Sequence, residues 1–139
     1  MKGFARSIGF TTSITAEIQA LRDGLLLADQ IGVQNLVIEL DAKVVMELVQ
    51  SETTSNAFYS SLLTDCMSLL GRFQHCKVQH VFCEVNRAVG ALAKLGCDMQ
   101  ENFVIMDSPP SNVMSNFVYS NAMGEKFYRL IASNLAILA

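Results

Sequence analysis

The 139-residue sequence lacks an excess of basic residues, with ten Lys and Arg against thirteen Asp and Glu. Nucleic-acid binding that depends mainly on electrostatics relies on Lys and Arg to neutralise phosphates. The formal net charge of −3 therefore excludes a strongly electrostatic binder and leaves room only for a local basic patch. With 51% hydrophobic and 17% charged residues, the chain is typical of one globular domain with a single core.

The sequence also lacks a CxxC pair, a visible leader and an internal repeat. The first four residues lead directly into strand-like sequence, so we expect no cleavable signal. The apolar stretch 130–139 is interrupted by Ser133 and Asn134, and it is shorter than the roughly 20 residues that span a bilayer. These absences predict a soluble protein of the cytosol or nucleus, not a secreted one, with four reduced thiols: Cys66, Cys76, Cys83 and Cys97.

Hydrophobic spacing predicts the first elements. Residues 3–10 alternate weakly, as the tail of a strand does. Ser13 is a plausible N-cap for a helix that Gly32 ends near Gln30. Residues 35–40 form a short apolar run, which is typical of a strand buried on both faces. The helix carries apolar residues at helical spacing: Ile14, Ile18, Leu21, Leu25 and Ala28.

The middle of the chain continues the alternation of helices and strands. Asp41 would cap a second helix, and a polar break then precedes a third. The resulting order β-α-β-α-α-β-α predicts an α/β fold with a largely parallel sheet and helical crossovers. The core side of the third helix would hold Phe58, Leu62, Leu63, Cys66, Leu69 and Leu70. The predicted elements are helix 41–49, break 51–55, helix 56–73, strand 76–82 and helix 86–99.

The chain changes character after residue 101. Pro109 and Pro110 cannot continue a helix and indicate a turn or linker. Beyond them, residues 125–139 could form a short amphipathic, largely apolar helix. We therefore expect two parts, an α/β domain at residues 3–101 and a C-terminal tail at 102–139 without chemistry of its own.

Two segments carry a carboxylate, and a third carries a glycine at a position where a carboxylate is expected. Glu17 lies in Thr-Ala-Glu-Ile-Gln-Ala-Leu, Asp41 closes Leu-Val-Ile-Glu-Leu-Asp, and Gly90 ends Glu-Val-Asn-Arg-Ala-Val-Gly. In this order and spacing the segments resemble the ribonuclease H type 1 domain of plant retroelement-derived and related proteins, over residues 3–99. The resemblance implies a mixed sheet with flanking helices. Its first three strands are antiparallel, and the fourth and fifth run parallel to the first.

The resemblance also implies a role for the acids. Family members cut the RNA strand of RNA–DNA hybrids with two Mg²⁺ ions about 4 Å apart. The first two family strands, which supply an Asp that contacts both ions, would precede Gly3, so we expect a fold that lacks them. Gly90 stands where the family has another Asp. Glu17 and Asp41 are thus the remaining metal ligands, and we expect hybrid binding with weak or no hydrolysis, since Mg²⁺ demands full octahedral coordination.

Each candidate residue also has a structural interpretation. Glu17 would interact favourably with its own helix dipole, and Asp41 would serve as a helix cap. Glu39 could approach the site or remain a solvated residue at a sheet edge. His80 resembles the family histidine that assists product release, but it also suits the end of a half-buried strand. A zinc site is disfavoured, because Cys76 and His80 would lie roughly 13 Å apart on a strand.

The expected loss of the first strand leaves alternatives for structure and function. In the family sheet that strand lies between the second and the fourth, so strand 36–40 would present an open apolar edge. Residues 3–8 could move there, a partner chain could fill it, or the domain could be marginally stable. The rival functions are a protein-interaction module, which would self-associate through this edge or the tail, and an incomplete gene product.

Overall fold

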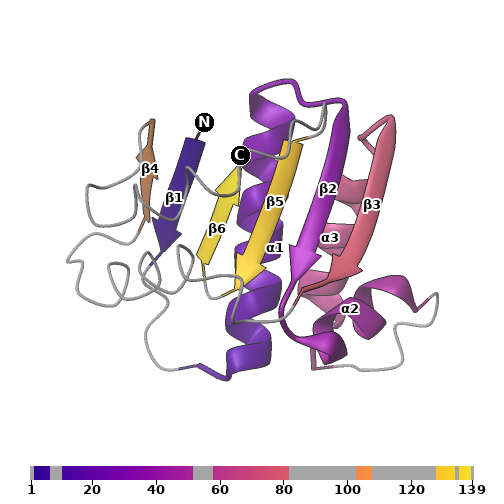
Figure 1. The fold of residues 1–139 in the computed structure, drawn as a ribbon. Coiled ribbons are helices and arrows are strands. Elements are labelled where there is room, and N and C mark those ends of the chain that lie inside the picture. The colour runs from indigo at the N-terminus through magenta and orange to yellow at the C-terminus, as the bar shows by residue number, and fades with distance from the viewer. Residues whose placement is uncertain are drawn as a thin grey trace.

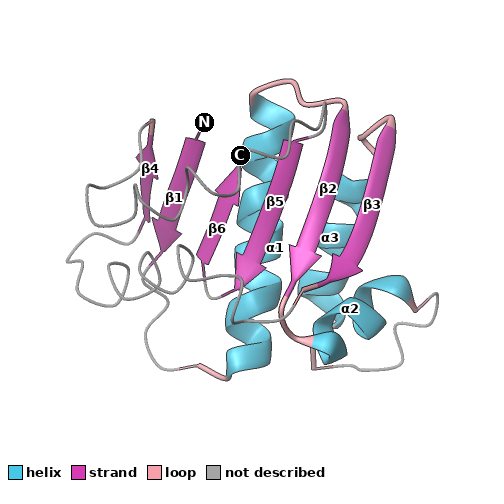
Figure 2. Cartoon of the chain, viewed as in Figure 1, coloured by secondary structure: helices cyan, strands magenta, loops and turns pink. Residues whose placement is uncertain are grey.

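A computed structural model describes residues 2–6, 11–51, 58–81, 103–107, 128–133 and 135–138. The described strands form one sheet in the order β3-β2-β5-β6-β1-β4 (Figure 1, Figure 2). Strand β2 is parallel to β3 and β5, and the other neighbours are antiparallel. The predicted α/β class with a mixed sheet is confirmed, although only part of the sheet is parallel. The elements are β1 (Lys2–Arg6), α1 (Ser13–Gln30), β2 (Asn35–Leu40), α2 (Lys43–Gln50), α3 (Ser60–Leu70), β3 (His75–His80), β4 (Phe103–Met106), β5 (Tyr128–Ser133) and β6 (Leu135–Leu138).

Helix α1 has the predicted length, and local sequence explains both of its ends. Thr12, not Ser13, is the N-cap, because its hydroxyl accepts from the Thr15 N–H at 3.2 Å. Gly32 adopts a φ of 76° just after the helix, where a residue without a Cβ is favoured. Its N–H donates to Asp29 and the Val33 N–H to Ala28, both at 3.0 Å, which is the Schellman pattern.

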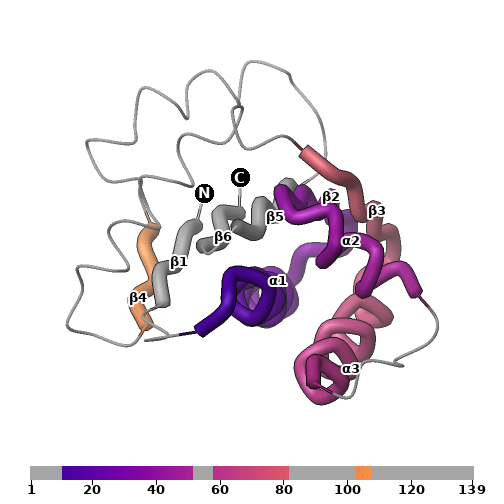
Figure 3. The backbone as a smooth tube through the Cα atoms, turned by 90° about the horizontal axis from the view of Figure 1, so that it is seen from below, coloured from indigo at the N-terminus to yellow at the C-terminus, as the bar shows by residue number. Residues whose placement is uncertain are grey.

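Strand β2 provides the centre of the core, with the bounds that the sequence predicts. Alternate residues Leu36, Ile38 and Leu40 are fully buried. Helices α1 and α3 cover the same face of the sheet (Figure 3). Each buried aliphatic side chain contributes roughly 1.5–3 kcal/mol. The core cluster comprises Ile18, Leu21, Leu25, Leu27, Ala28, Val33, Leu36, Ile38, Leu40, Val45, Val49, Leu63, Cys66, Leu69 and Phe73.

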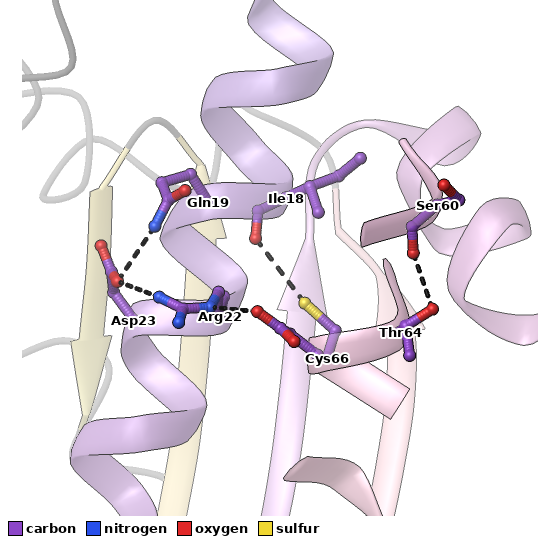
Figure 4. Close-up of polar contacts among 8 residues, drawn as sticks. Ile18, Gln19, Arg22, Asp23, Ser60, Thr64 and Cys66 are labelled. Carbon is purple, nitrogen blue, oxygen red and sulfur yellow. Dashed lines mark hydrogen bonds and ion pairs between the residues drawn. The ribbon is translucent and has the colours of Figure 1, made fainter. Parts of the chain in front are cut away.

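Side-chain contacts join helix α1 to α3 (Figure 4) and to the turn that follows α3. Arg22 donates to Asp65 on α3 at 2.9 Å, and Arg72, just after α3, donates to Asp29 at 2.7 Å. In both pairs the two partners are 43 residues apart in the sequence. A step toward the C-terminus on α1 is therefore matched by an equal step on the α3 side, so the two helices run in the same direction. Between the helices, burial raises the pKa of the Cys66 thiol to about 12. The thiol therefore stays protonated, and its Sγ donates to the Ile18 carbonyl at 3.8 Å.

Three predicted boundaries are wrong by a few residues. Helix α2 begins at Lys43 with Ala42 as N-cap and no side-chain cap, so Asp41 does not cap it. Helix α3 spans Ser60–Leu70 and Phe58 precedes it, so the prediction of a longer helix with Phe58 on its core side is wrong. Phe58 is 79% exposed and packs edge-on against Tyr59 instead. Strand β3 spans His75–His80, ending two residues earlier than predicted.

The largest difference concerns the C-terminal residues. The expected helix at 125–139 is wrong at the described residues, which form strands β5 and β6. Strand β5 pairs with β2 from Leu36↔Tyr128 to Leu40↔Ala132, so the edge predicted to be open is filled. Strand β1 lies farther away, between β6 and β4, and does not move into that place. The physical reason is tertiary: an apolar segment beside an unpaired buried strand gains more from pairing than from helix propensity.

Several sequence predictions concern residues outside the described ranges. They include the helix at 86–99 with Gly90, the thiols of Cys83 and Cys97, and the Pro109–Pro110 linker. Within the described ranges, no helix has both the length and the apolar character needed to cross a membrane.

Candidate active site

The candidate site lies where α1 begins and β2 ends. Helix α1 runs antiparallel to β2, so its first turns lie beside the carboxyl end of that strand (Figure 1). Glu17 lies in these first turns, and Asp41 directly follows β2. The carboxyl ends of parallel strands are the usual place for ligand sites in α/β sheets. The chain therefore brings together the two acids that the sequence analysis predicts to be metal ligands.

Glu17 is held in place at the start of α2. Only 4% of the residue is exposed, and its Oε1 accepts from the Ala42 N–H at 3.0 Å. A carboxylate at this position also faces the positive end of the α2 dipole. The dipole interaction of Glu17 thus involves the helix that follows Asp41 and not its own, because the first turn of α1 contains no acidic residue.

The charge state of Glu17 depends on its neighbours. Burial is the largest influence and raises the pKa of Glu17 from 4.5 to about 8. The Ala42 hydrogen bond lowers this pKa, and the nearby charge of Asp41 raises it again. Two carboxyl groups at one site resist joint ionisation, because like charges disfavour the second charge. Near neutral pH the protonated form of Glu17 therefore predominates when the site holds no cation.

The segment that carries Asp41 is fixed from three sides. The Val81 N–H donates to the Leu40 carbonyl at 2.9 Å, and the Ala42 N–H is bound by Glu17. His80 Nε2 lies 3.0 Å from the Asp41 carbonyl oxygen. Because a carbonyl can only accept, Nε2 must carry the proton in this contact. His80 therefore supports the main chain of Asp41, in addition to any role toward a substrate.

Glu39 does not lie at a solvated edge, so that interpretation is wrong. Only 7% of the residue is exposed, and its Oε1 accepts from Gln79 Nε2 at 3.0 Å. Glu39 and Gln79 are register partners on β2 and β3. Glu39 lies between buried Ile38 and Leu40, so its side chain points to the opposite face of the sheet from theirs.

The donor set suits a single cation better than two. Glu17 and Asp41 offer carboxylate oxygens, which Mg²⁺ accepts together with water. Among the residues that the structure describes, no group of three or more His, Cys, Asp and Glu side chains could hold a metal. A cation between the two acids would relieve the repulsion that raises the pKa of Glu17. This pair therefore fits one hydrated ion.

Sequence reasoning missed two polar contacts at and near the site. The Ala42 N–H that binds Glu17 is 25 residues away along the chain, and the Gln79 amide that binds Glu39 is 40 residues away. Neither contact has a local sequence signal, because each depends on how separate elements pack. Parallel pairing of β2 and β3 could have suggested the second contact, but only once the register was known.

Comparison with known proteins identifies the family of the chain. Residues 2–96 match the family described as reverse transcriptase-like. The chain is 25% identical over 122 residues to an Arabidopsis thaliana protein named as a ribonuclease H protein, in a match that covers 88% of this chain. The chain spans only 20% of that relative's length. No solved structure matches. The chain therefore belongs to the reverse transcriptase-like family and carries an RNase H-like domain.

Proposed function

We propose that this chain is a nucleic-acid-binding RNase H-like domain that binds RNA–DNA hybrids at Glu17 and Asp41, holds one Mg²⁺ there, and hydrolyses the RNA strand weakly or not at all. The observation that carries the proposal is the position of buried Glu17 on the Ala42 N–H, next to Asp41 at the end of β2, where burial also raises the pKa of Glu17. A buried acid held next to a second acid destabilises the free domain at high pH, so its position is better explained by a cation that arrives with the ligand.

The residues define what the cation would do. Glu17 and Asp41 would hold it, and His80 would keep the Asp41 main chain in place through its Nε2. When bound, Mg²⁺ would neutralise the carboxylates and attract a phosphate oxygen of the nucleic acid. Lys43 is exposed and follows Asp41 by two positions in the sequence. Its ammonium group would add a phosphate contact.

Two features of the sequence support incomplete catalysis. The strand that pairs with β2 at the site is β5, Tyr-Arg-Leu-Ile-Ala-Ser, which contains no acidic residue. Gly90 stands at the position where the resemblance implies a further Asp. Two-metal hydrolysis requires both ions to be clamped on one phosphate. With Glu17 and Asp41 alone, the second ion would have no carboxylate of its own.

A binding and cleavage experiment tests the proposal. Fluorescence anisotropy with a labelled RNA–DNA hybrid should show Mg²⁺-dependent binding that weakens with salt, whereas Glu17→Gln should reduce the Mg²⁺ dependence. The matched control is Asp29→Asn, which removes an acid near the other end of α1 that pairs with Arg72 at 2.7 Å. Gel analysis of the same samples should show little RNA cleavage. Efficient turnover that Glu17→Gln abolishes would contradict incomplete catalysis, and absence of hybrid binding would contradict the whole proposal.

A second candidate function is self-association through the edge of the sheet. Strand β4 lies at the end of the strand order, and it exposes two large apolar side chains, Phe103 and Ile105. An uncharged edge strand is a template for pairing with a second copy. Light scattering after size exclusion should then show a dimer that Ile105→Lys converts to a monomer. Hybrid binding that persists in the monomeric variant would favour the first function.

A further inference from the structure

An interior strand of this sheet comes from the last residues of the chain. Strand β5 lies between β2 and β6, yet it begins at Tyr128. Strand β6 then pairs with β1 through Lys2↔Leu138 and Gly3↔Ile137, which brings the two ends of the chain side by side (Figure 1). The hairpin of β5 and β6 is therefore inserted between elements that all precede residue 107.

The site that this hairpin fills is formed by β2 and α1. Strand β2 offers one main-chain edge to β5, and its other edge is already paired with β3. Helix α1 packs against both β5 and β6 and closes one face of the same site. The residues of β2 and α1 in this region, including Leu36, Ile38 and Leu21, are almost completely buried. An empty site would expose this apolar surface and a row of unpaired backbone groups. Both would lower the stability of the folded domain.

The pairing defines the kind of segment that fits. The first strand must run parallel to β2, since the register advances from Leu36↔Tyr128 to Leu40↔Ala132. The second strand must return antiparallel to the first, as in the pairs from Leu130↔Leu138 to Ser133↔Leu135. Residues 128–138 contain one charged residue, Arg129, no acid and no proline, and most of them are apolar. The absence of proline leaves every main-chain N–H of the segment available for pairing, and the apolar side chains suit a place inside a sheet.

The hairpin is joined to β4 through residues 107–127. Its pairing with β1 involves Lys2 and Gly3, whereas its pairing with β2 extends along five consecutive residues, 36–40. Among the described strands the hairpin alone joins β1 and β4 to β2, so the two parts of the sheet need an occupant of this kind to stay together.

We propose that β2 and α1 form a strand-acceptor site, and that the C-terminal hairpin Tyr128–Leu138 occupies it as a separable segment. The ligand class of this site is an apolar β-hairpin whose first strand runs parallel to β2. This inference concerns a surface different from the acidic pair, and it holds whether or not the domain binds a hybrid.

Cross-linking tests the site in the intact chain. Paired strands lie about 4.8 Å apart, within the range of Cα separations that a disulfide bridges. The register partners Val37→Cys and Arg129→Cys should therefore form a disulfide on oxidation, identified by peptide mass mapping. The matched control is Val37→Cys with Ser133→Cys, which are four residues out of register, roughly 13 Å along the strand. A disulfide in the first variant alone supports the site, within one chain or between two copies. Equal cross-linking in both variants, or none in either, overturns it.

A cut chain tests whether the hairpin is separable. A protease sequence inserted between Ser111 and Asn112 of the full chain allows cleavage after folding. The two pieces should still elute together, and a labelled synthetic peptide of residues 126–139 in excess should replace the C-terminal piece. The same peptide with Ile131→Pro should not replace the C-terminal piece, because proline removes an N–H and distorts a central strand. Release of the C-terminal piece while the remainder keeps its thermal midpoint would overturn the proposal, as would equal exchange by both peptides.

Discussion

The two ends of helix α1 place their acidic residues in opposite electrostatic environments. In its C-terminal half, Asp29 accepts from Arg72, and Arg22 donates to Asp65 on α3. At its start, Glu17 faces a second acid and a main-chain N–H, and among the described residues no arginine or lysine pairs with it. The first arrangement joins two helices, whereas the second places two like charges together.

This difference separates structural acids from candidate functional ones. Salt bridges such as Arg72–Asp29 contribute modestly to stability and need no further ligand. A buried acid beside another acid lowers the stability of the free protein whenever both are ionised. The start of α1 therefore has the properties of a ligand site, and its C-terminal half has those of a packing interface. Four predictions test this contrast.

The largest effect should be a pH dependence of stability that originates at Glu17. Its folded pKa of about 8 lies above the ordinary 4.5, so the folded protein binds an extra proton between these values. The stabilisation is fully present below pH 4.5 and is lost as pH rises through 8, by on the order of 4 kcal/mol. Urea unfolding at pH 5 and pH 9 should show this loss in the unmodified chain.

Glu17→Gln should remove most of that pH dependence, because the amide keeps an oxygen for the Ala42 N–H but cannot ionise. The variant should therefore be more stable than the unmodified chain at pH 9 and similar at pH 5. Glu47→Gln, at an exposed position on α2, should leave the pH profile unchanged. Equal pH profiles for the unmodified chain and Glu17→Gln would show that the two ends of α1 do not differ in this way.

The second effect should be stabilisation by Mg²⁺ at high pH. A cation that binds only the folded state at ten times its dissociation constant adds about 1.4 kcal/mol. At pH 9, where Glu17 is ionised, Mg²⁺ should raise the thermal midpoint of the unmodified chain. The midpoint should not respond in Glu17→Gln, and Glu47→Gln should respond as the unmodified chain does. An equal Mg²⁺ response in Glu17→Gln would place the ion elsewhere.

How much of this contrast the sequence predicts depends on how far apart the interacting residues lie along the chain. Helix α1 and strand β2 follow from local periodicity and from Gly32, and these two elements alone bring Glu17 near Asp41. The start of α2 does not follow, because Ala42, not Asp41, is its N-cap, and Glu17, 25 residues away, binds the Ala42 N–H. The raised pKa of Glu17 likewise arises from burial, which a sequence pattern does not measure.

The C-terminal hairpin marks where local sequence is least informative. Residues 130–138 are apolar enough for a short helix, and the pairing of Tyr128 with Leu36 gives no sequence signal between positions so far apart. What decides between helix and strand for this segment is pairing with the free edge of β2. That edge exists only after the rest of the sheet has formed. The same reasoning correctly predicts that this edge needs an occupant, but it does not identify the occupant.

The third effect concerns the support of Asp41 by His80. A hydrogen bond of this kind contributes roughly 1 kcal/mol, and its loss would also loosen the main chain that positions the acid. His80→Ala should therefore lower stability by about that amount and weaken Mg²⁺ binding several-fold, measured by titration of the thermal midpoint. His75→Ala is the matched control, since His75 is exposed at the opposite end of β3. If both variants bind Mg²⁺ equally well, His80 has no positioning role.

The smallest effects should come from the two ion pairs between α1 and α3. The arginine of the Arg22–Asp65 pair is 31% exposed at its side chain, whereas that of Arg72–Asp29 is 56% exposed and more screened by solvent. Double-mutant cycles with alanine should give coupling energies of about 0.2–1 kcal/mol, larger for Arg22–Asp65 than for Arg72–Asp29. Neither cycle should change between pH 6 and pH 9 by more than its error, because each acid in these pairs faces an arginine. A coupling that falls as Glu17 ionises would instead mean that the two ends of α1 are energetically linked.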